Sequence, residues 1–123
     1  GDLPAHDGLW QAAVETAHDP LARLSVVPMV LEARGLDVTP AMINRLRRAG
    51  DGKSADLLET ILNEEIAHVA AGSRWFFHLC RYHKLPEVET WRALVGKHYS
   101  GELKPPFNER ARSAAGMLPG LYL

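Results

Sequence analysis

The sequence contains a single cysteine, Cys80, so no disulfide can form within the chain. A lone thiol fits a reducing, intracellular setting, and we therefore expect a cytoplasmic protein. Because Cys80 lies in a largely apolar stretch with a helical pattern, we expect it to be an inert core residue rather than a reactive thiol.

The sequence also lacks an excess of charge and any long apolar run. Fourteen Lys and Arg residues stand against 15 Asp and Glu residues, for a formal net charge of −1. This balance argues against a dedicated nucleic-acid binder, because such proteins carry a basic stripe. The densest basic patch, at Arg45, Arg47, Arg48 and Lys53, is best explained as a solvated helix face. No run approaches the roughly 20 apolar residues that a membrane span needs, so we predict no membrane insertion.

Sustained alternation of apolar and polar residues, which would indicate β-strands, is absent as well. Hydrophobic residues make up 46% of the 123 residues, which is enough to build one core. We predict a single all-α domain over residues 1–123, with long helices at about residues 8–34 and 55–84. Long antiparallel helices of this kind belong to helical bundles.

Prolines and glycines mark the expected helix boundaries. Pro20 either begins a new helix capped by Asp19 or kinks one long helix, and Pro28 is a second expected kink. Gly35 is expected to end the first long helix. Asp7 is expected to cap the first long helix, and Ser54 to cap the second. Between them, Thr39 and Pro40 are expected to begin a short helix at 40–49 that ends at Gly50. We expect further helices at 87–98 and 108–115, separated by a rigid Pro105-Pro106 connector, and a tail at 117–123.

Two polar residues interrupt the apolar face of the helix at 55–84. At about 100° per residue, Glu65 and His68 fall in the same narrow sector as Ile61 and Gly72. Burying an unpaired carboxylate is costly, so Glu65 needs a compensating partner. A cation held between the two side chains would provide it, and these ligand types suit iron, manganese or zinc. The alternative is a core histidine bonded to a carbonyl and a glutamate paired with an arginine.

A second carboxylate, Glu32, follows the apolar series of the first long helix and can also face inward. Its alternative role is a salt bridge with Arg34 or Arg23, or an exposed place near a helix end. Glu15 and His18 form another Glu-x-x-His pair. Glu15 would lie about 25 Å from Glu32 along an unbroken helix, so the two cannot serve one dinuclear site. We prefer Glu32 as a ligand and keep Glu15 and His18 in reserve.

Three segments resemble an uncharacterised ferritin-like family catalogued as a domain of unknown function: LPAHDGLW at 3–10, TAHDPLARLSVVPMVLEARGLDVTP at 16–40 and LNEEIAHVAAGSRWFFHLC at 62–80. Ferritin-like di-iron proteins are four-helix bundles in which two helices each give a Glu and two each give a Glu-x-x-His. The resemblance implies that Glu32 is the lone carboxylate of the third helix. It also implies that Glu65 and His68 form the Glu-x-x-His of the fourth, in a site that holds two iron, manganese or zinc ions.

The resemblance covers the second half of that family's domain, and the start at Gly1 rather than Met fits a truncation between the second and third helices. We expect either a homodimer through the face of Glu32, Glu65 and His68, or assembly with the missing N-terminal half of the bundle. The expected function is that of a di-metal carboxylate protein, either an O₂-activating oxidase or hydroxylase or a metal-handling protein. The alternative is a non-catalytic helical interaction module without metal.

Overall fold

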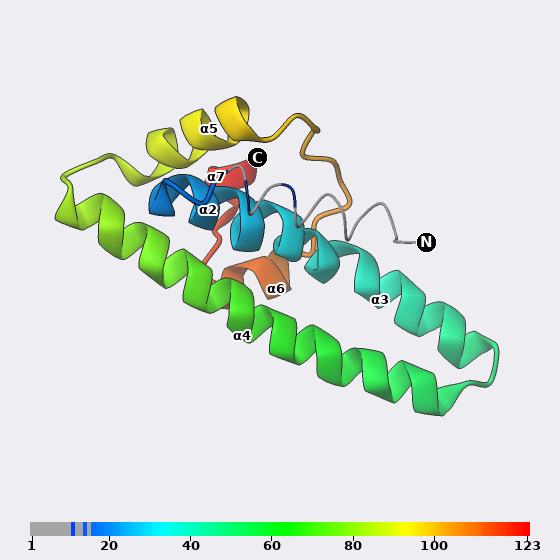
Figure 1. Cartoon of the computed structure of the whole chain (residues 1–123). Helices are drawn as coiled ribbons and strands as arrows, with labels where there is room; N and C mark the ends of the chain where they lie inside the picture. Colours follow the sequence, from blue (N-terminus) through cyan, green and yellow to red (C-terminus); the bar gives the residue numbers. More distant parts are fainter. Residues whose placement is uncertain (1–10, 12–13, 15) are drawn as a thin grey trace.

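The computed structural model describes residues 11, 14 and 16–123, and this part of the chain contains helices and no strand (Figure 1). Helix α2 (Pro20–Val26), the π-helix η1 (Val27–Glu32) and α3 (Ala33–Arg48) follow one another without a break. After a turn at 49–51, helix α4 (Gly52–Tyr82) runs back alongside all three. The shorter helices are α5 (Glu87–His98), α6 (Glu109–Ala114) and α7 (Pro119–Tyr122).

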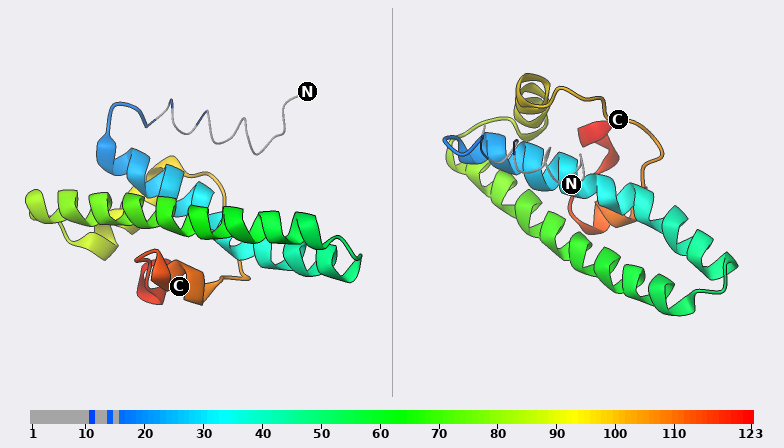
Figure 2. Two further views of the ribbon diagram at one scale, coloured as in Figure 1. Left: turned by 90° about the horizontal axis from the view of Figure 1, so that it is seen from below. Right: turned by 45° about the vertical axis from the view of Figure 1, so that its right-hand side comes forward.

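The long antiparallel pair forms a layer, and the C-terminal helices pack against it. Figure 2 shows α6 and α7 on one side of this layer, where they contact α3, α4 and α5. The all-α prediction is confirmed over the described residues. In the same part of the chain, no helix combines the length and the apolar character needed to cross a bilayer.

The first long helix differs from the prediction of residues 8–34. The chain turns at residues 16–18, and Pro20 then begins α2. The Asp19 carboxylate accepts hydrogen bonds from the backbone N–H groups of Leu21 at 3.0 Å and Ala22 at 3.3 Å. The new helix behind Asp19 is therefore confirmed, and the alternative of one kinked helix is wrong. The predicted cap Asp7 lies outside the described residues.

Gly35 does not end the helix, and Thr39 and Pro40 do not begin another. Helix α3 continues through Pro40 to Arg48, because its buried side chains pack along α4 and this packing outweighs the local cost of Gly35 and Pro40. The predicted end at Gly50 is confirmed, and its φ of 84° is one that glycine adopts without strain.

The later helices begin and end within one turn of the residues predicted from the sequence. Helix α4 begins at Gly52 rather than Ala55, because the Asp51 carboxylate caps it by accepting a hydrogen bond from the Ser54 backbone N–H at 3.1 Å. The predicted helix at 87–98 is observed as α5, and that at 108–115 as α6 behind the cap Asn108. The expected tail at 117–123 contains the short helix α7.

The expected kink at Pro28 takes the form of the π-helix η1. Proline lacks an N–H group, so it cannot donate the usual hydrogen bond to the carbonyl one turn before it. The Ala33 N–H reaches back to the Pro28 carbonyl, which is the i to i−5 bond of a π-helix. Such segments are frequent at functional sites, and η1 ends at Glu32.

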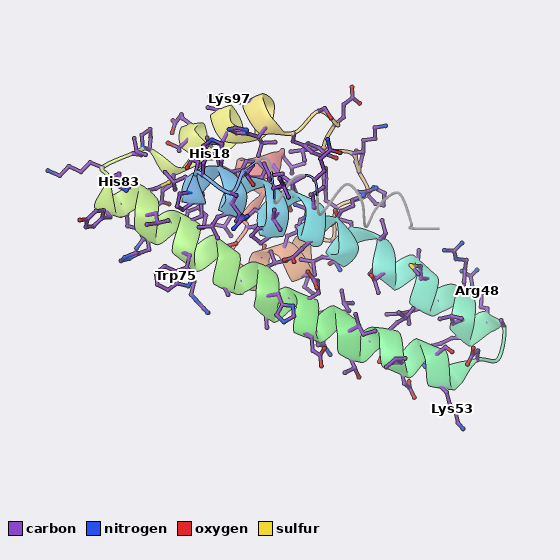
Figure 3. All side chains as sticks on the ribbon, viewed as in Figure 1. His18, Arg48, Lys53, Trp75, His83 and Lys97 are labelled. Atoms are coloured by element: carbon purple, nitrogen blue, oxygen red, sulfur yellow. The ribbon has the colours of Figure 1, made fainter. Side chains whose placement is uncertain are left out.

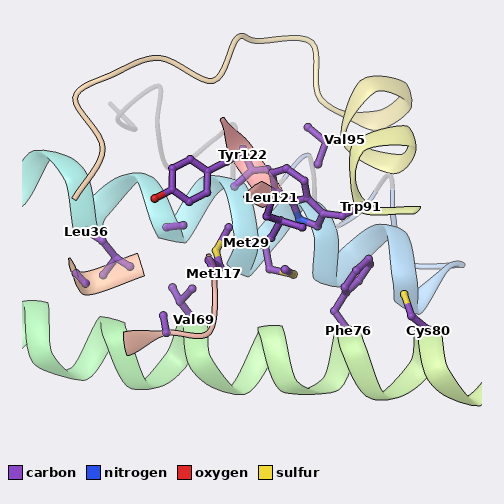
Figure 4. Close-up of a cluster of buried hydrophobic side chains, with 14 residues drawn as sticks. Met29, Leu36, Val69, Phe76, Cys80, Trp91, Val95, Met117, Leu121 and Tyr122 are labelled. Atoms are coloured by element: carbon purple, nitrogen blue, oxygen red, sulfur yellow. The ribbon is translucent and has the colours of Figure 1, made fainter. Parts of the chain in front are cut away.

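The hydrophobic core lies between the long antiparallel pair and the C-terminal helices (Figure 4). It joins Met29 of η1 and Leu36 of α3 to Phe76 of α4 and Trp91 of α5. Its other fully buried members are Ala33, Val69, Cys80, Ala115 and Met117.

The burial of Cys80 gives the first testable prediction. Its side chain has no exposed surface, and burial, with a smaller effect from the Glu87 charge, raises the pKa of the thiol. We expect alkylation by iodoacetamide at pH 8 to be at least about tenfold slower in the native protein than in urea, because the reactive thiolate is both scarce and shielded. Mass spectrometry over time would measure it, and equal rates in both conditions would show that Cys80 is accessible.

Candidate metal centre

The candidate ligands come from two adjacent elements. Glu32 is the last residue of η1, and Glu65 and His68 lie one turn apart on α4. Helix α4 packs directly on η1, so the structure brings together residues that lie 33 or more positions apart in the sequence.

A close contact between Gly72 and Pro28 sets the distance between these two elements. A Cβ atom added to Gly72 would lie 2.6 Å from both Cβ and Cγ of the Pro28 ring. Only glycine therefore allows η1 to approach α4 this closely. Glu32 lies one turn after Pro28 in η1, and His68 lies one turn before Gly72 in α4. Because the two elements are antiparallel, both steps go in the same direction in space, so Glu32 and His68 lie at the same level.

The two carboxylates influence each other electrostatically. Burial raises the pKa of Glu32, the negative charge of Glu65 raises it further, and His68 partly lowers it. Glu65 Oε2 lies 3.7 Å from Nδ1 of His68, which is an ion-pair distance but too long for a hydrogen bond. The other oxygen, Oε1, is buried and accepts no hydrogen bond from the described residues. The pair of carboxylates is thus short of positive partners.

Arg34 does not form a salt bridge with Glu32 or Glu65. Its Nη1 atom instead donates to Asp37 Oδ2 at 3.4 Å and to the carbonyls of Lys104 at 2.6 Å and Pro106 at 3.2 Å. No arginine among the described residues forms an ion pair with Glu65 within 4.0 Å.

His68 does not face the core as the sequence predicts. Its side chain is 67% exposed, whereas that of Glu65 is 26% exposed. The core face of α4 is centred on Val69, Gly72 and Phe76, and His68 lies about 100° from Val69 around the helix axis. Glu65 therefore borders the core, and His68 points to a neighbouring face.

The remaining sequence candidates do not join this group. Glu15 lies outside the described residues, and His18 is exposed in the turn before Asp19. Across the described chain, no three or more His, Cys, Asp or Glu side chains are arranged to hold a metal ion by themselves. Glu32, Glu65 and His68 have the oxygen and nitrogen donors that iron, manganese or zinc accept, but they form a partial set.

A pocket of about 820 Å³ opens beside the candidate centre, and both Glu32 and Glu65 line it. Most of its wall is apolar, and it is built by η1, α3, α4, the segment 99–107 and Arg112 of α6. The principal apolar residues are Val30, Leu31, Ile61, Leu62, Leu103 and Phe107. The carboxylates therefore face a space that could admit a small molecule.

Sequence reasoning did not find the buried ion pair at the edge of this pocket. Arg112 of α6 donates from Nε to Asp37 Oδ1 at 2.9 Å and from Nη2 to Oδ2 at 2.6 Å. The Asn108 backbone N–H also donates to Asp37 Oδ1 at 2.8 Å. Nothing in a single sequence links two residues 75 positions apart, although an aspartate inside α3 beside the buried Leu36 was a hint.

The described part of the chain is all-helical, and sequence comparison gives the family. Residues 1–123 match the family described as "Protein of unknown function (DUF455)", and the chain belongs to it. The chain is 39% identical over 116 residues to an uncharacterized protein of Haemophilus influenzae, covering 94% of this chain and 40% of that protein. It thus spans less than half the length of this relative. No solved structure matches the chain.

Proposed function

We propose that this chain supplies half of a dinuclear metal site in a ferritin-like carboxylate protein, with Glu32, Glu65 and His68 as ligands. The observation that carries the proposal is the buried, unpartnered Oε1 of Glu65 close to a second carboxylate whose pKa is raised. Two carboxylates in this position destabilise a protein unless a cation compensates them. A bound metal ion would remove both the repulsion and the unsatisfied acceptor.

The partial donor set requires ligands from outside this chain. A ferritin-like di-metal site uses four glutamates and two histidines, and Glu32, Glu65 and His68 amount to half of that number. A second copy would supply the same three residues again. The additional length of the Haemophilus influenzae relative would be the other source.

When bound, two iron or manganese ions would supply Lewis-acid chemistry and electron transfer to O₂. The residues of this chain would bind those ions, and the contact between Gly72 and Pro28 would hold η1 and α4 at the spacing the ligands need. The apolar wall would limit water and orient an apolar small molecule beside the carboxylates. This pocket favours an oxidase or hydroxylase over metal handling alone.

Metal-dependent stability tests the proposal. The metal-free chain would be titrated with Fe(II) without oxygen, and separately with Mn(II) and Zn(II), while thermal unfolding is followed. At a free metal concentration 100 times the Kd, binding stabilises the folded chain by about 2.7 kcal/mol. We expect Glu32→Gln and Glu65→Gln to lose this gain. Without metal, both variants should be more stable than the wild type, because the carboxylate repulsion is gone.

The matched control is Glu64→Gln, which removes a carboxylate from the adjacent, exposed position. It should keep the full metal-induced gain. Elemental analysis of this chain and of the full-length Haemophilus influenzae relative gives a second readout. The proposal fails if neither protein holds metal and if Glu65→Gln and His68→Asn match the wild type with and without metal. That result would favour the non-catalytic helical interaction module.

A further inference from the structure

Helix α4 has a second face, which the described part of the chain leaves uncovered. We name this face the α4 stripe, and it consists of Leu57, Ile61, Glu64, His68, Ala71, Trp75, His78 and Tyr82. Its large apolar side chains are 61% exposed at Leu57, 45% at Ile61, 60% at Trp75 and 75% at Tyr82. Figure 3 shows Trp75 projecting away from the other helices.

The spacing of the α4 stripe is that of a helix–helix seam. Its members recur at alternating intervals of four and three residues from 57 to 82, which is the pattern of side chains that interlock with a neighbouring helix. The stripe follows α4 for about 37 Å, at 1.5 Å per residue. A partner must therefore offer a helix about as long as α4 itself.

We propose that a second copy of this chain packs on the α4 stripe, with the two α4 helices antiparallel about a two-fold axis between His68 and Ala71. In this arrangement Leu57 meets the partner's Tyr82, and Ile61 meets the partner's His78. Such an interface is self-complementary, as two-fold symmetry requires.

The distribution of charge along α4 supports a copy in this orientation. The N-terminal half carries four acidic residues and one lysine, whereas residues 69–84 contain Arg74, Arg81 and Lys84 and no acid. Antiparallel pairing places each acidic half beside a basic half, and parallel pairing would place like charges together. Arg47 already binds Asp56 and Glu59, so the acidic group that the α4 stripe offers to a partner is chiefly Glu64, which lies within one residue of the level of the partner's Arg74.

The same arrangement does not bring the two candidate metal centres together, because Glu65 and the partner's Glu65 lie nine residues, or about 13.5 Å, apart along the antiparallel pair. The His68 side chains of both copies lie beside the axis. In this register the interface is independent of the proposed metal site, whose missing ligands would come from the additional length of the longer relative. The exposure of His68 then follows from its place in an interface rather than in the core of one chain.

Cysteine cross-linking tests the interface directly. Ala71→Cys places a thiol beside the axis, and Asn63→Cys places one on an exposed flank of α4 about 110° from the centre of the stripe. The native Cys80 is buried, so we expect it not to form cross-links in this experiment. After oxidation with diamide, we expect Ala71→Cys to run as a disulfide-linked dimer on a non-reducing gel and Asn63→Cys to stay monomeric.

A mixture of two variants tests the orientation. Antiparallel helices bring Leu57→Cys in one copy next to Tyr82→Cys in the other, so the mixture should cross-link better than either variant alone. Parallel helices would cross-link each variant to itself, which would overturn the antiparallel arrangement.

Sedimentation of the full chain measures the affinity. We expect a wild-type dimer, and a rise of about tenfold or more in the dimer dissociation constant for Trp75→Glu, because an exposed aromatic anchor is replaced by a charge. Circular dichroism would confirm that this variant folds. The double variant Glu65→Gln/His68→Asn should still dimerise without metal, which separates a failure of the metal site from a failure of the interface.

Two results would overturn the proposal. One is a wild-type chain that sediments as a monomer, which would assign the α4 stripe to a helix from the additional length of the longer relative. The other is equal cross-linking of Asn63→Cys and Ala71→Cys.

Discussion

Replacing Arg112 with alanine is expected to destabilise the protein by about 3–5 kcal/mol, because it leaves a buried carboxylate without its main partner. The side chains of Arg112 and Asp37 are 3% and 0% exposed and form two hydrogen bonds with each other. The guanidinium group also lies 4.4 Å from the ring centre of Tyr122 and 5.0 Å from that of Phe107. Urea unfolding followed by circular dichroism would measure the loss.

The matched control is Arg47→Ala, which removes an exposed arginine paired with Asp56 and Glu59. Solvent screens such surface pairs, so the urea midpoint should change little. Converting Asp37 to Asn in the Arg112→Ala background should recover part of the loss, since the unpaired charge disappears. If Arg112→Ala were no more harmful than Arg47→Ala, the buried pair would not hold α6 to α3.

The substitution Gly72→Ala is expected to cost about 1–3 kcal/mol, because the new methyl group overpacks the contact between α4 and η1. The atoms it would meet, Cβ and Cγ of Pro28 at 2.6 Å, belong to a rigid ring that cannot turn aside. The two elements must separate, which also moves Glu32 away from Glu65 and His68. If the proposed function holds, the metal-induced rise in the thermal midpoint should therefore shrink in this variant, although no proposed ligand is changed.

Gly96→Ala on α5 is the matched control, because a Cβ there meets nothing within 4 Å. Alanine in a helix interior is favoured over glycine by about 0.5–1 kcal/mol, so this variant should be as stable as the wild type or more stable. Equal effects of the two substitutions on thermal unfolding would contradict the tight contact at Gly72.

The sequence predicted the elements whose signals are local. Asp19 before Pro20 and glycine at position 50 gave correct boundaries because a capping carboxylate and a left-handed backbone act within one turn. Gly35 and Pro40 misled the prediction of helix ends. Their local cost is real, but the packing of α3 along α4 outweighs it, and a single sequence does not show which helices will pack.

Of the candidate residues, the place of Glu65 in the fold was predictable from the sequence and that of His68 was not. The position of Glu65 within the apolar face of the predicted helix indicated that its side chain is partly buried, and the structure places it at the edge of the core. The exposure of His68 was missed because a position on the border of a stripe can face either way. Two further contacts could not be predicted: the ion pair between Asp37 and Arg112, and the close approach of Gly72 to Pro28. Both join residues that are distant in the sequence, and neither produces a recognisable sequence pattern.

The π-helix η1 also determines the rotational phase of everything that follows it. A π turn takes up about one more residue than an α turn, so α3 is rotated by about 100° relative to an uninterrupted helix starting at Pro20. Without that extra residue, the face of α3 that bears Leu36 and Asp37 would turn away from α4 and α6. The segment around Pro28 therefore acts as a phase shift within one long helix, and both the core and the buried ion pair depend on it.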